Sequence, residues 1–179
     1  MGCWTCEKQQ MARRIQSLQE FFPYYLGEHR SATSRRLHFL GTSGFLTASA
    51  ASAALNPLGF GAGLTAMCLL AWHGLKAEKK ALSLPHVIGM VAAPSLASPA
   101  LFPAGVLCAY GCAWLGHFRF EGNKPATFQY PIMSLVSDFR MYGQMLRGRL
   151  WKGDPLVELG LESPGPGEAT RPDDAPARG

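Results

Sequence analysis

Charge is missing from two long parts of this 179-residue sequence: no Asp, Glu, Lys or Arg occurs from Phe39 to Leu75 or from Val87 to Phe118. Such gaps argue against an ordinary soluble helical domain, whose helices carry a charged face. The mean hydropathy of the whole chain is nevertheless near zero, because the polar residues concentrate outside these two stretches. Each stretch is long enough for two short membrane crossings.

Several functional motifs are also missing. The sequence has no phosphate-binding loop and no dinucleotide-binding fingerprint. It has five histidines but no HxxHH box, which excludes the di-iron desaturases with their clustered histidines. The CxxC of Cys3 and Cys6 has no second pair, so a zinc site is not expected there. The basic residues flank the apolar stretches and form no stripe with interleaved aromatics, so nucleic acid is not an expected partner.

The two uncharged stretches consist of apolar segments that are separated by turn signals. The glycine-rich run ALNPLGFGAG, with its single proline, divides Phe39–Leu55 from Leu58–Leu75. A second apolar segment runs from about Pro85 to Phe118 and is broken near SPALFP. Its first limb is short and contains Pro94, which predicts a kinked or re-entrant helix. We predict an all-α polytopic membrane protein with about four transmembrane helices as two hairpins, flanked by amphipathic helices.

The flanking helices are predicted from their apolar stripes. Residues 7–22 carry one stripe at helical spacing, formed by Met11, Ile15, Leu18 and Phe22. A second stripe follows the apolar region and is formed by Ile132, Leu135, Val136, Phe139, Tyr142, Leu146 and Leu150. We assign residues 1–153 to a membrane-embedded helical domain. Residues 154–179 form an acidic, Pro/Gly-rich tail that we expect to be disordered, because from Ser163 on it has no means of building a core.

The basic residues predict an orientation in the membrane. Residues 154–179 hold six of the 12 acids and two of the 17 bases, so residues 1–153 carry fifteen bases and six acids. All fifteen bases lie in the N-terminal arm, in the loop around 76–80, or after the fourth crossing. The two hairpin tips, around 56 and 100, carry none. Because bases concentrate in cytosolic loops, we predict an even number of crossings with both termini in the cytosol.

The same topology places all five histidines at the cytosolic face. His29 and His38 precede the first crossing, His73 ends the second, His86 opens the third and His117 ends the fourth. One explanation is that polar rings simply favour helix ends. The other is a metal site, because imidazole binds iron, zinc and copper.

Spacing adds a carboxylate to the possible metal site. His117 and Glu121 are four residues apart and share a face if the helix continues. Together with a histidine of the N-terminal arm they would resemble the two-histidine, one-carboxylate site of non-haem iron enzymes. Glu121 could instead pair with a surface base, or orient a ligand ring from outside the metal site. His29 and His38 are nine residues apart, and a turn in the SATS segment would be needed to bring them together.

Two blocks of this sequence resemble a known family. FFPYYLGEHRSATSRRLHFLGT and WLGHFRFEGNKPATFQYPIMSLVSDFRMYGQML cover roughly residues 20–42 and 114–150. They are similar to the signature blocks of the 2-hydroxy-fatty-acid (2-hydroxypalmitate) dioxygenase-like family of small membrane proteins. The resemblance implies a multi-pass protein of the endoplasmic reticulum membrane. It also implies an Fe(II)-dependent enzyme that uses molecular oxygen to remove the carboxyl carbon of 2-hydroxy long-chain fatty acids, in α-oxidation downstream of phytosphingosine breakdown.

The resemblance also selects residues. It implies metal ligands at His29, His38 and His117, and it places Glu121 at the acidic, catalytic position. A 2-hydroxy acid suits this chemistry, because its hydroxyl and carboxylate can chelate iron while its acyl tail lies among apolar helices and membrane lipid. The nearest bases for its carboxylate are Arg35, Arg36 and Arg119. The competing interpretation is a non-catalytic helical membrane scaffold whose histidines pack at helix ends.

Overall fold

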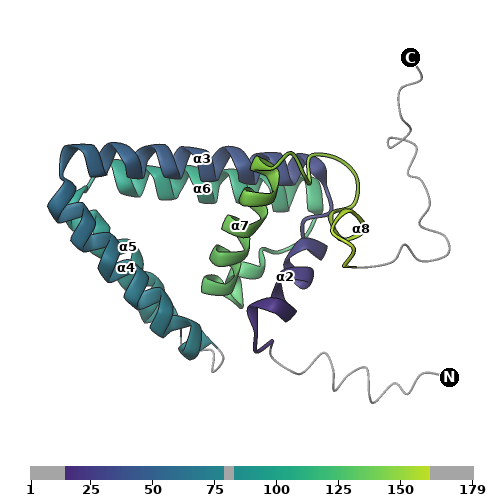
Figure 1. Cartoon of the computed structure of the whole chain (residues 1–179), viewed down its shortest axis with the longest axis horizontal. Helices are drawn as coiled ribbons and strands as arrows, with labels where there is room; N and C mark the ends of the chain where they lie inside the picture. The colour runs from purple at the N-terminus through teal and green to yellow at the C-terminus, as the bar shows by residue number, and fades with distance from the viewer. Residues whose placement is uncertain (1–14, 79–82, 162–179) are drawn as a thin grey trace.

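The computed structural model describes residues 15–78 and 83–161, and these residues form seven α-helices and no strand (Figure 1). The α-helices are α2 (Leu18–Gly27), α3 (Ala32–Leu55), α4 (Pro57–Glu78), α5 (Leu84–Ala97), α6 (Leu101–Gly116), α7 (Pro131–Leu146) and α8 (Pro155–Glu158). A π-helical segment, His117–Glu121, continues α6, and a 3-10 turn, Ala126–Phe128, precedes α7. The described part of the chain is all-α, as predicted.

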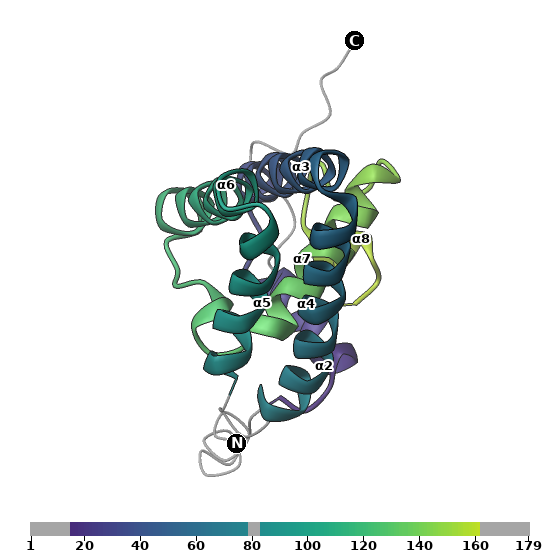
Figure 2. The same cartoon turned by 90° about the vertical axis from the view of Figure 1, so that its left-hand side faces the viewer.

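The four long helices form two pairs. α3 lies alongside α6 and α4 alongside α5, and the second pair runs obliquely away from one end of the first (Figures 1 and 2). The predicted breaks are present, since α3 ends at Leu55 and α5 ends at Ala97. The two corners lie together, with the hydroxyl oxygens of Ser52 and Ser98 only 2.7 Å apart. The predicted hairpins therefore open at their corners instead of packing along their length.

Glycines explain why the pairs form between these helices. A Cβ added to Gly41 of α3 would lie 3.0 Å from the Cα of Ala109 in α6. A Cβ added to Gly63 of α4 would lie 2.8 Å from the Cα of Pro94 in α5. Small residues at such faces let helix backbones approach closely, which is how helices associate in lipid.

Two helices of the described residues are long and apolar enough to cross a membrane, Pro57–Ala77 and Leu101–Glu121. Only 17% and 22% of the 18-residue apolar stretch in each helix is buried inside the protein, whereas the core helix of a soluble protein is mostly buried. α5 is also apolar, but its 14 residues span about 21 Å, which is less than the ~30 Å of a bilayer core. α3 is long, although it is rich in Ala, Ser, Thr and Gly.

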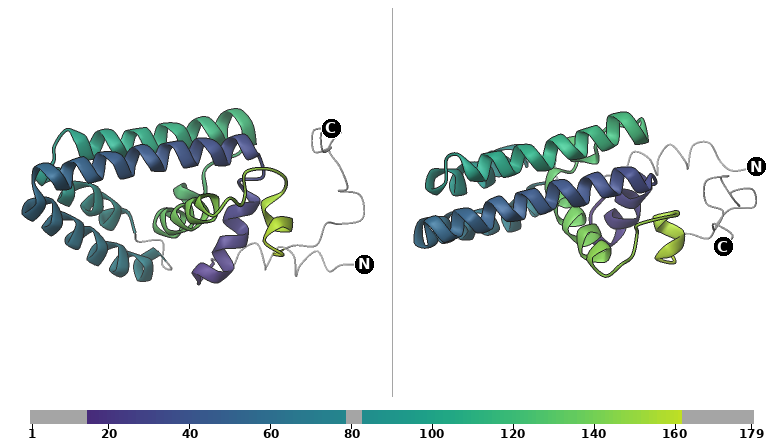
Figure 3. Two further views of the ribbon diagram at one scale, coloured as in Figure 1. Left: turned by 45° about the horizontal axis from the view of Figure 1, so that its top comes forward. Right: turned by 90° about the horizontal axis from the view of Figure 1, so that it is seen from above.

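α2, α7 and α8 gather near the end of the α3–α6 pair that lies far from the corners (Figures 1 and 3). They share a hydrophobic core, formed by Phe21, Phe22, Tyr25, Leu26, Ala126, Tyr130, Met133, Met141, Met145, Leu150 and Leu156. Burying a large apolar side chain contributes about 1.5–3 kcal/mol. This core therefore holds the turn after α2 firmly against α7.

The first flanking helix has different bounds from those predicted. α2 begins at Leu18 because Ser17 caps it, its hydroxyl accepting the backbone N–H of Glu20 at 3.2 Å. The predicted helix over residues 7–22 is thus wrong at residues 15–17, and α2 continues to Gly27. Residues 1–14 of that prediction lie outside the described residues.

The second flanking helix, α7, is present but buries only part of the predicted stripe. Ile132 is buried in α7, and Leu150 is buried beyond its end at Leu146. Val136, Phe139 and Leu146 of the predicted stripe are 36%, 37% and 63% exposed. The buried positions are Ile132, Met133, Ser134, Ser137, Met141 and Met145. The reason is Asp138, whose carboxylate accepts hydrogen bonds from α2 and α3 and so determines how α7 is rotated.

The segment after residue 153 begins with packed structure. Asp154 caps α8 by accepting the backbone N–H of Leu156 at 2.9 Å, and it pairs with Arg30 at 3.0 Å. Leu156 is 4% exposed and belongs to the hydrophobic core. Residues 162–179, which include the predicted disordered tail from Ser163 on, lie outside the described residues.

Candidate metal centre

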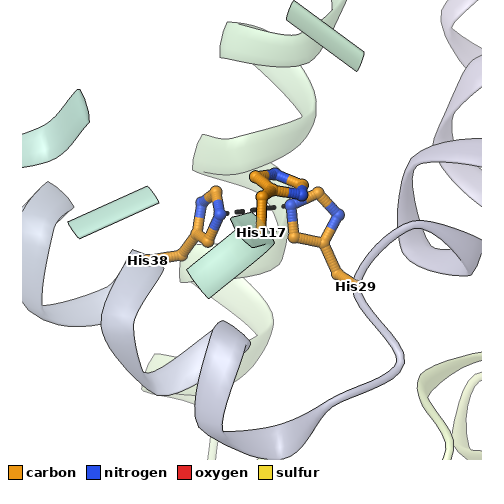
Figure 4. Close-up of side chains that lie close together, drawn as sticks. All are labelled: His29, His38 and His117. Atoms are coloured by element: carbon orange, nitrogen blue, oxygen red, sulfur yellow. Dashed lines mark hydrogen bonds between the residues drawn. The ribbon is translucent and has the colours of Figure 1, made fainter. Parts of the chain in front are cut away.

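Three histidines from separate elements meet where α3, α6 and α7 come together (Figure 4). His29 lies in the turn after α2, His38 in the second turn of α3, and His117 at the start of the π-helical segment. Each offers one ring nitrogen, and the three nitrogens lie within 4.8 Å of one another. The side chains are 0%, 7% and 2% exposed. The structure thus brings together the three histidines that the resemblance selects.

The turn between His29 and His38 comes earlier than predicted. α2 ends at Gly27, and the hydroxyl of Ser31 caps α3 by accepting the backbone N–H of Ser34 at 3.4 Å. The SATS segment therefore begins α3, and His29 itself belongs to the turn.

A buried arginine holds this turn in place. The side chain of Arg35 is fully buried, and each of its five N–H donors reaches a backbone carbonyl oxygen. The acceptors are those of Leu150 (2.8 Å), His29 (2.9 Å), Arg30 (2.7 Å), Lys152 (3.2 Å) and Gly153 (2.8 Å). Arg35 joins the histidine turn to the segment after α7, and it has no donor left for the carboxylate of a ligand.

His117 lies where the chain changes from an α-helix to a π-helix. α6 ends at Gly116, and the next five residues form the π-helical segment. It ends at Gly122, whose φ of 69° lies in the left-handed region that favours glycine. Single π-helical turns within α-helices occur frequently at functional sites. Here the π-helical turn begins at His117, whose ring lies 4.6 Å from that of His29 between centroids.

Each imidazole is held by an oxygen atom on its Nδ1. The three pairs are His29 with the Tyr25 carbonyl (2.6 Å), His38 with the Asp138 carboxylate (2.7 Å) and His117 with the Asn123 side-chain oxygen (2.8 Å). Because carbonyl and carboxylate oxygens only accept, Nδ1 carries the proton in the first two rings. The Asn123 amide group also donates to the Glu28 carbonyl at 3.0 Å, which orients its oxygen toward His117 in the same way.

In a neutral ring whose Nδ1 carries the proton, Nε2 has the lone pair that a metal ion would bind. The Nε2 atoms of His29 and His38 are 3.2 Å apart, which is a hydrogen-bond distance when one of them carries a proton (Figure 4). Ring nitrogens bind transition metals at about 2.0–2.1 Å, so two ligands of one ion lie about 3 Å apart. A histidine that binds a metal through one ring nitrogen usually donates the N–H of its other ring nitrogen to an oxygen atom. The donor set therefore fits a divalent transition metal.

The electrostatics of the site favour a neutral ring at His29 and a negative charge at Asp138. Burial, together with the neighbouring rings of His38 and His117, lowers the pKa of His29 well below its ordinary value. Although burial alone would raise the pKa of Asp138, hydrogen bonds from His38, Thr42 and Tyr25 hold it below its ordinary value. Asp138 is therefore ionised at neutral pH, and it compensates part of the charge of a bound metal.

A cavity of ≈ 80 Å³ opens beside His38 and His117. Its apolar wall is formed largely by α6 and α7, through Ala109, Ala113, Trp114, Pro131 and Leu135. Its polar lining includes Tyr25, Thr42, Ser134 and Asp138. The cavity is large enough for a small polar group next to the histidines.

The other predicted residues lie elsewhere. Glu121 accepts the backbone N–H of Ser31 at 2.9 Å and does not belong to the histidine cluster. Arg36 donates to the Trp151 carbonyl at 3.0 Å, and the guanidinium of Arg119 lies 5.8 Å from the Phe120 ring centre. Neither these arginines nor Arg35 line the cavity.

His73 and His86 form a separate pair. The Nδ1 of His73 lies 2.8 Å from the Nε2 of His86, and their rings stack near the loop between α4 and α5. They do not join the three-histidine cluster.

Sequence reasoning missed Asp138 and Asn123, the outer partners of His38 and His117. A signal for Asp138 exists, because it is the only acidic residue between Glu121 and Asp154. The only other charged residue in this helix is Arg140, and an isolated acid in a partly buried helix needs a partner. No comparable signal marks Asn123.

Three buried imidazoles with oriented rings define a candidate mononuclear metal centre at one end of a helical protein. The chain that carries it belongs to the 2-hydroxy-palmitic acid dioxygenase Mpo1-like family, whose family model matches residues 15–150. The matched range includes all three histidines, Asn123 and Asp138. Comparison with curated proteins and with solved structures finds no match.

Proposed function

We propose that this protein is an Fe(II)-dependent dioxygenase of fatty acid α-oxidation. Its reaction removes the carboxyl carbon of 2-hydroxy long-chain fatty acids that arise from phytosphingosine breakdown. The observation that carries the proposal is the buried set of three oriented histidine rings in a member of the 2-hydroxy-palmitic acid dioxygenase Mpo1-like family. The substrate class rests on the family's description, and the metal rests on the preference of neutral imidazoles for divalent transition ions.

His29, His38 and His117 would hold the iron through Nε2. When bound, Fe(II) supplies redox chemistry toward molecular oxygen and a Lewis-acid site for a 2-hydroxy acid. The protein's own part is to keep the rings oriented. The Tyr25 carbonyl and the Asp138 carboxylate keep the protons of His29 and His38 on Nδ1, so the nitrogens converge without rearrangement.

The cavity would place the substrate. At ≈ 80 Å³ it admits the polar head of a fatty acid but not its chain. The chain would leave along the apolar wall of Ala109, Ala113 and Leu135, toward membrane lipid. This arrangement would keep bulk water away from the reacting carbon.

We propose that Glu121 helps to position two of the histidines and does not contact the substrate. Its carboxylate accepts the N–H of Ser31, the residue that caps α3 between His29 and His38. It therefore supports the turn that holds these two histidines in place.

We further propose that the protein spans the endoplasmic reticulum membrane about four times, with both termini in the cytosol. The two uncharged corners lie together at one end of the molecule, and α2, α7 and α8 lie toward the other end (Figure 1). Protease digestion of sealed membranes should remove tags at either terminus but protect a tag inserted between Ala97 and Leu101. Protection of one terminus alone would contradict an even number of crossings.

The test of the function is direct. The full chain, purified in mild detergent and loaded with Fe(II) without air, should retain about one iron per chain, as a single three-nitrogen site requires. On addition of oxygen it should convert 2-hydroxypalmitate to a product one carbon shorter, measured by mass spectrometry. Without Fe(II) the conversion should stop. A chain that binds no iron and leaves 2-hydroxypalmitate unchanged would instead be a non-catalytic membrane scaffold.

A further inference from the structure

One polar side chain in the cavity lacks a partner. Ser134 of α7 is 3% exposed, and its hydroxyl makes no hydrogen bond to any described residue. It lines the cavity together with His38 and His117. Buried polar groups are nearly always hydrogen-bonded, because an unsatisfied one costs free energy.

Ser134 does not make the hydrogen bond that serines in a helix commonly make. The hydroxyls of Ser34 and Ser49 are also buried without a partner, but neither residue lines the cavity. A serine within a helix commonly donates to the carbonyl four residues earlier. Ser52 does so to Ala48 at 2.8 Å, and Ser95 does so to Val91 at 2.7 Å. Ser134 donates its backbone N–H to the Tyr130 carbonyl at 2.9 Å, but its hydroxyl has no partner.

Four other hydroxyl-bearing residues line the cavity, and of these Tyr110 and Thr127 are only partly buried. The hydroxyls of Tyr25 and Thr42 both donate to Asp138, at 3.0 Å and 2.6 Å. No Lys or Arg of residues 15–78 and 83–161 lines this cavity, and the guanidinium of Arg35 has all five donors in use. A carboxylate entering beside the histidines therefore meets one fully buried donor that is not otherwise bonded, the Ser134 hydroxyl.

We propose that the Ser134 hydroxyl binds a carboxylate oxygen of the fatty acid in this cavity. The assignment rests on the proposed function, because it takes the acyl acid as the ligand. It gives the substrate carboxylate a partner in place of the arginines, and it places that carboxylate beside His38 and His117. Ser134 is in this sense a substrate-binding residue.

The test compares Ser134→Ala with Ser137→Ala in the full-length, iron-loaded protein. Ser137 lies one turn away on the same helix and is equally buried, at 2% exposed, but it does not line the cavity. A hydrogen bond to a charged group contributes enough that its loss should weaken binding of 2-hydroxypalmitate roughly 10- to 100-fold. Ser137→Ala should bind it as the wild type does. Iron content, measured separately, should be unchanged in both variants.

Two further measurements separate this role from a structural one. Palmitate retains the carboxylate but lacks the 2-hydroxyl, so Ser134→Ala should weaken its binding by the same factor. Without ligand, Ser134→Ala should unfold at the same or a higher temperature, because the substitution removes an unpaired hydroxyl. Ser134→Cys, which nearly keeps the volume and has a weak donor, should show the same loss of affinity if Ser134→Ala accumulates poorly.

Three outcomes are distinct. Equal affinity of Ser134→Ala and wild type for 2-hydroxypalmitate would overturn the assignment and leave the proposed function intact. Loss of affinity for 2-hydroxypalmitate but not for palmitate would overturn the carboxylate as the partner. A wild-type protein that binds neither acid would overturn the proposed function itself.

Discussion

Replacing His29, His38 or His117 singly by alanine is expected to abolish tight iron binding and turnover of 2-hydroxypalmitate, while each variant still inserts and accumulates. Each ring supplies one of three converging nitrogens, and the two that remain leave the metal with too few protein ligands. The loss should exceed the roughly 10- to 100-fold typical of an outer partner. Elemental analysis of the purified protein measures the iron, and mass spectrometry measures the turnover.

The matched controls are the remaining two histidines. His73→Ala and His86→Ala should keep iron, because these rings pair with each other near the α4–α5 loop and not with the cluster. Glu121→Gln should also keep iron, since an amide oxygen can still accept the N–H of Ser31, although turnover should fall. Wild-type iron content and turnover in the three alanine variants would refute the metal site. If all five histidines behave alike, packing at helix ends is a sufficient explanation.

The second large effect is expected at Asp138. Asp138→Asn keeps the shape of the side chain but removes its charge, and its amide group can donate to Nδ1 of His38. The proton of His38 would then move to Nε2, which would lose the lone pair that faces the other rings. We expect iron affinity to fall roughly 10- to 100-fold, as for outer partners of metal-ligating histidines. Competition with a chelator of known affinity measures this change.

Tyr25→Phe is the control for this substitution. It removes one hydrogen bond, of 3.0 Å, to the same carboxylate but leaves the charge of Asp138 and its bond to His38. Its effect on iron affinity should be several times smaller than that of Asp138→Asn. Equal effects of the two variants would mean that packing around Asp138, and not the tautomer of His38, supports the site.

Local sequence was enough to predict the long apolar helices and the breaks at the two corners. The uncharged stretches predicted long apolar helices, and the turn signals located the corners that follow Leu55 and Ala97. The corner after Leu55 depends on neighbouring residues, because Pro57 restricts the residue before it and favours the first turn of a new helix. The histidines of the cluster could be selected by their position at helix ends and by the resemblance of two sequence blocks.

The sequence could not determine features that depend on which faces of the helices pack together. The apolar stripe on α7 was misassigned because Met133 and Met141 compete with Val136 and Phe139 for the core, and period alone does not choose between them. Asp138 decides the choice through bonds to residues about a hundred positions away. Neither the spacing of residues nor the resemblance to a family reveals such contacts.

The sequence by itself therefore determined an all-α chain with uncharged helices, their corners and the identity of the three histidines. Only the tertiary structure decided that α3 packs on α6 and α4 on α5, because that choice depends on where Gly41 and Gly63 meet a facing backbone. It also decided that Asp138 and Asn123 orient the histidine rings, and that Arg35 closes the turn instead of facing the cavity. Helix formation is local in the chain, whereas hydrogen bonds between helices exist only once the helices have packed.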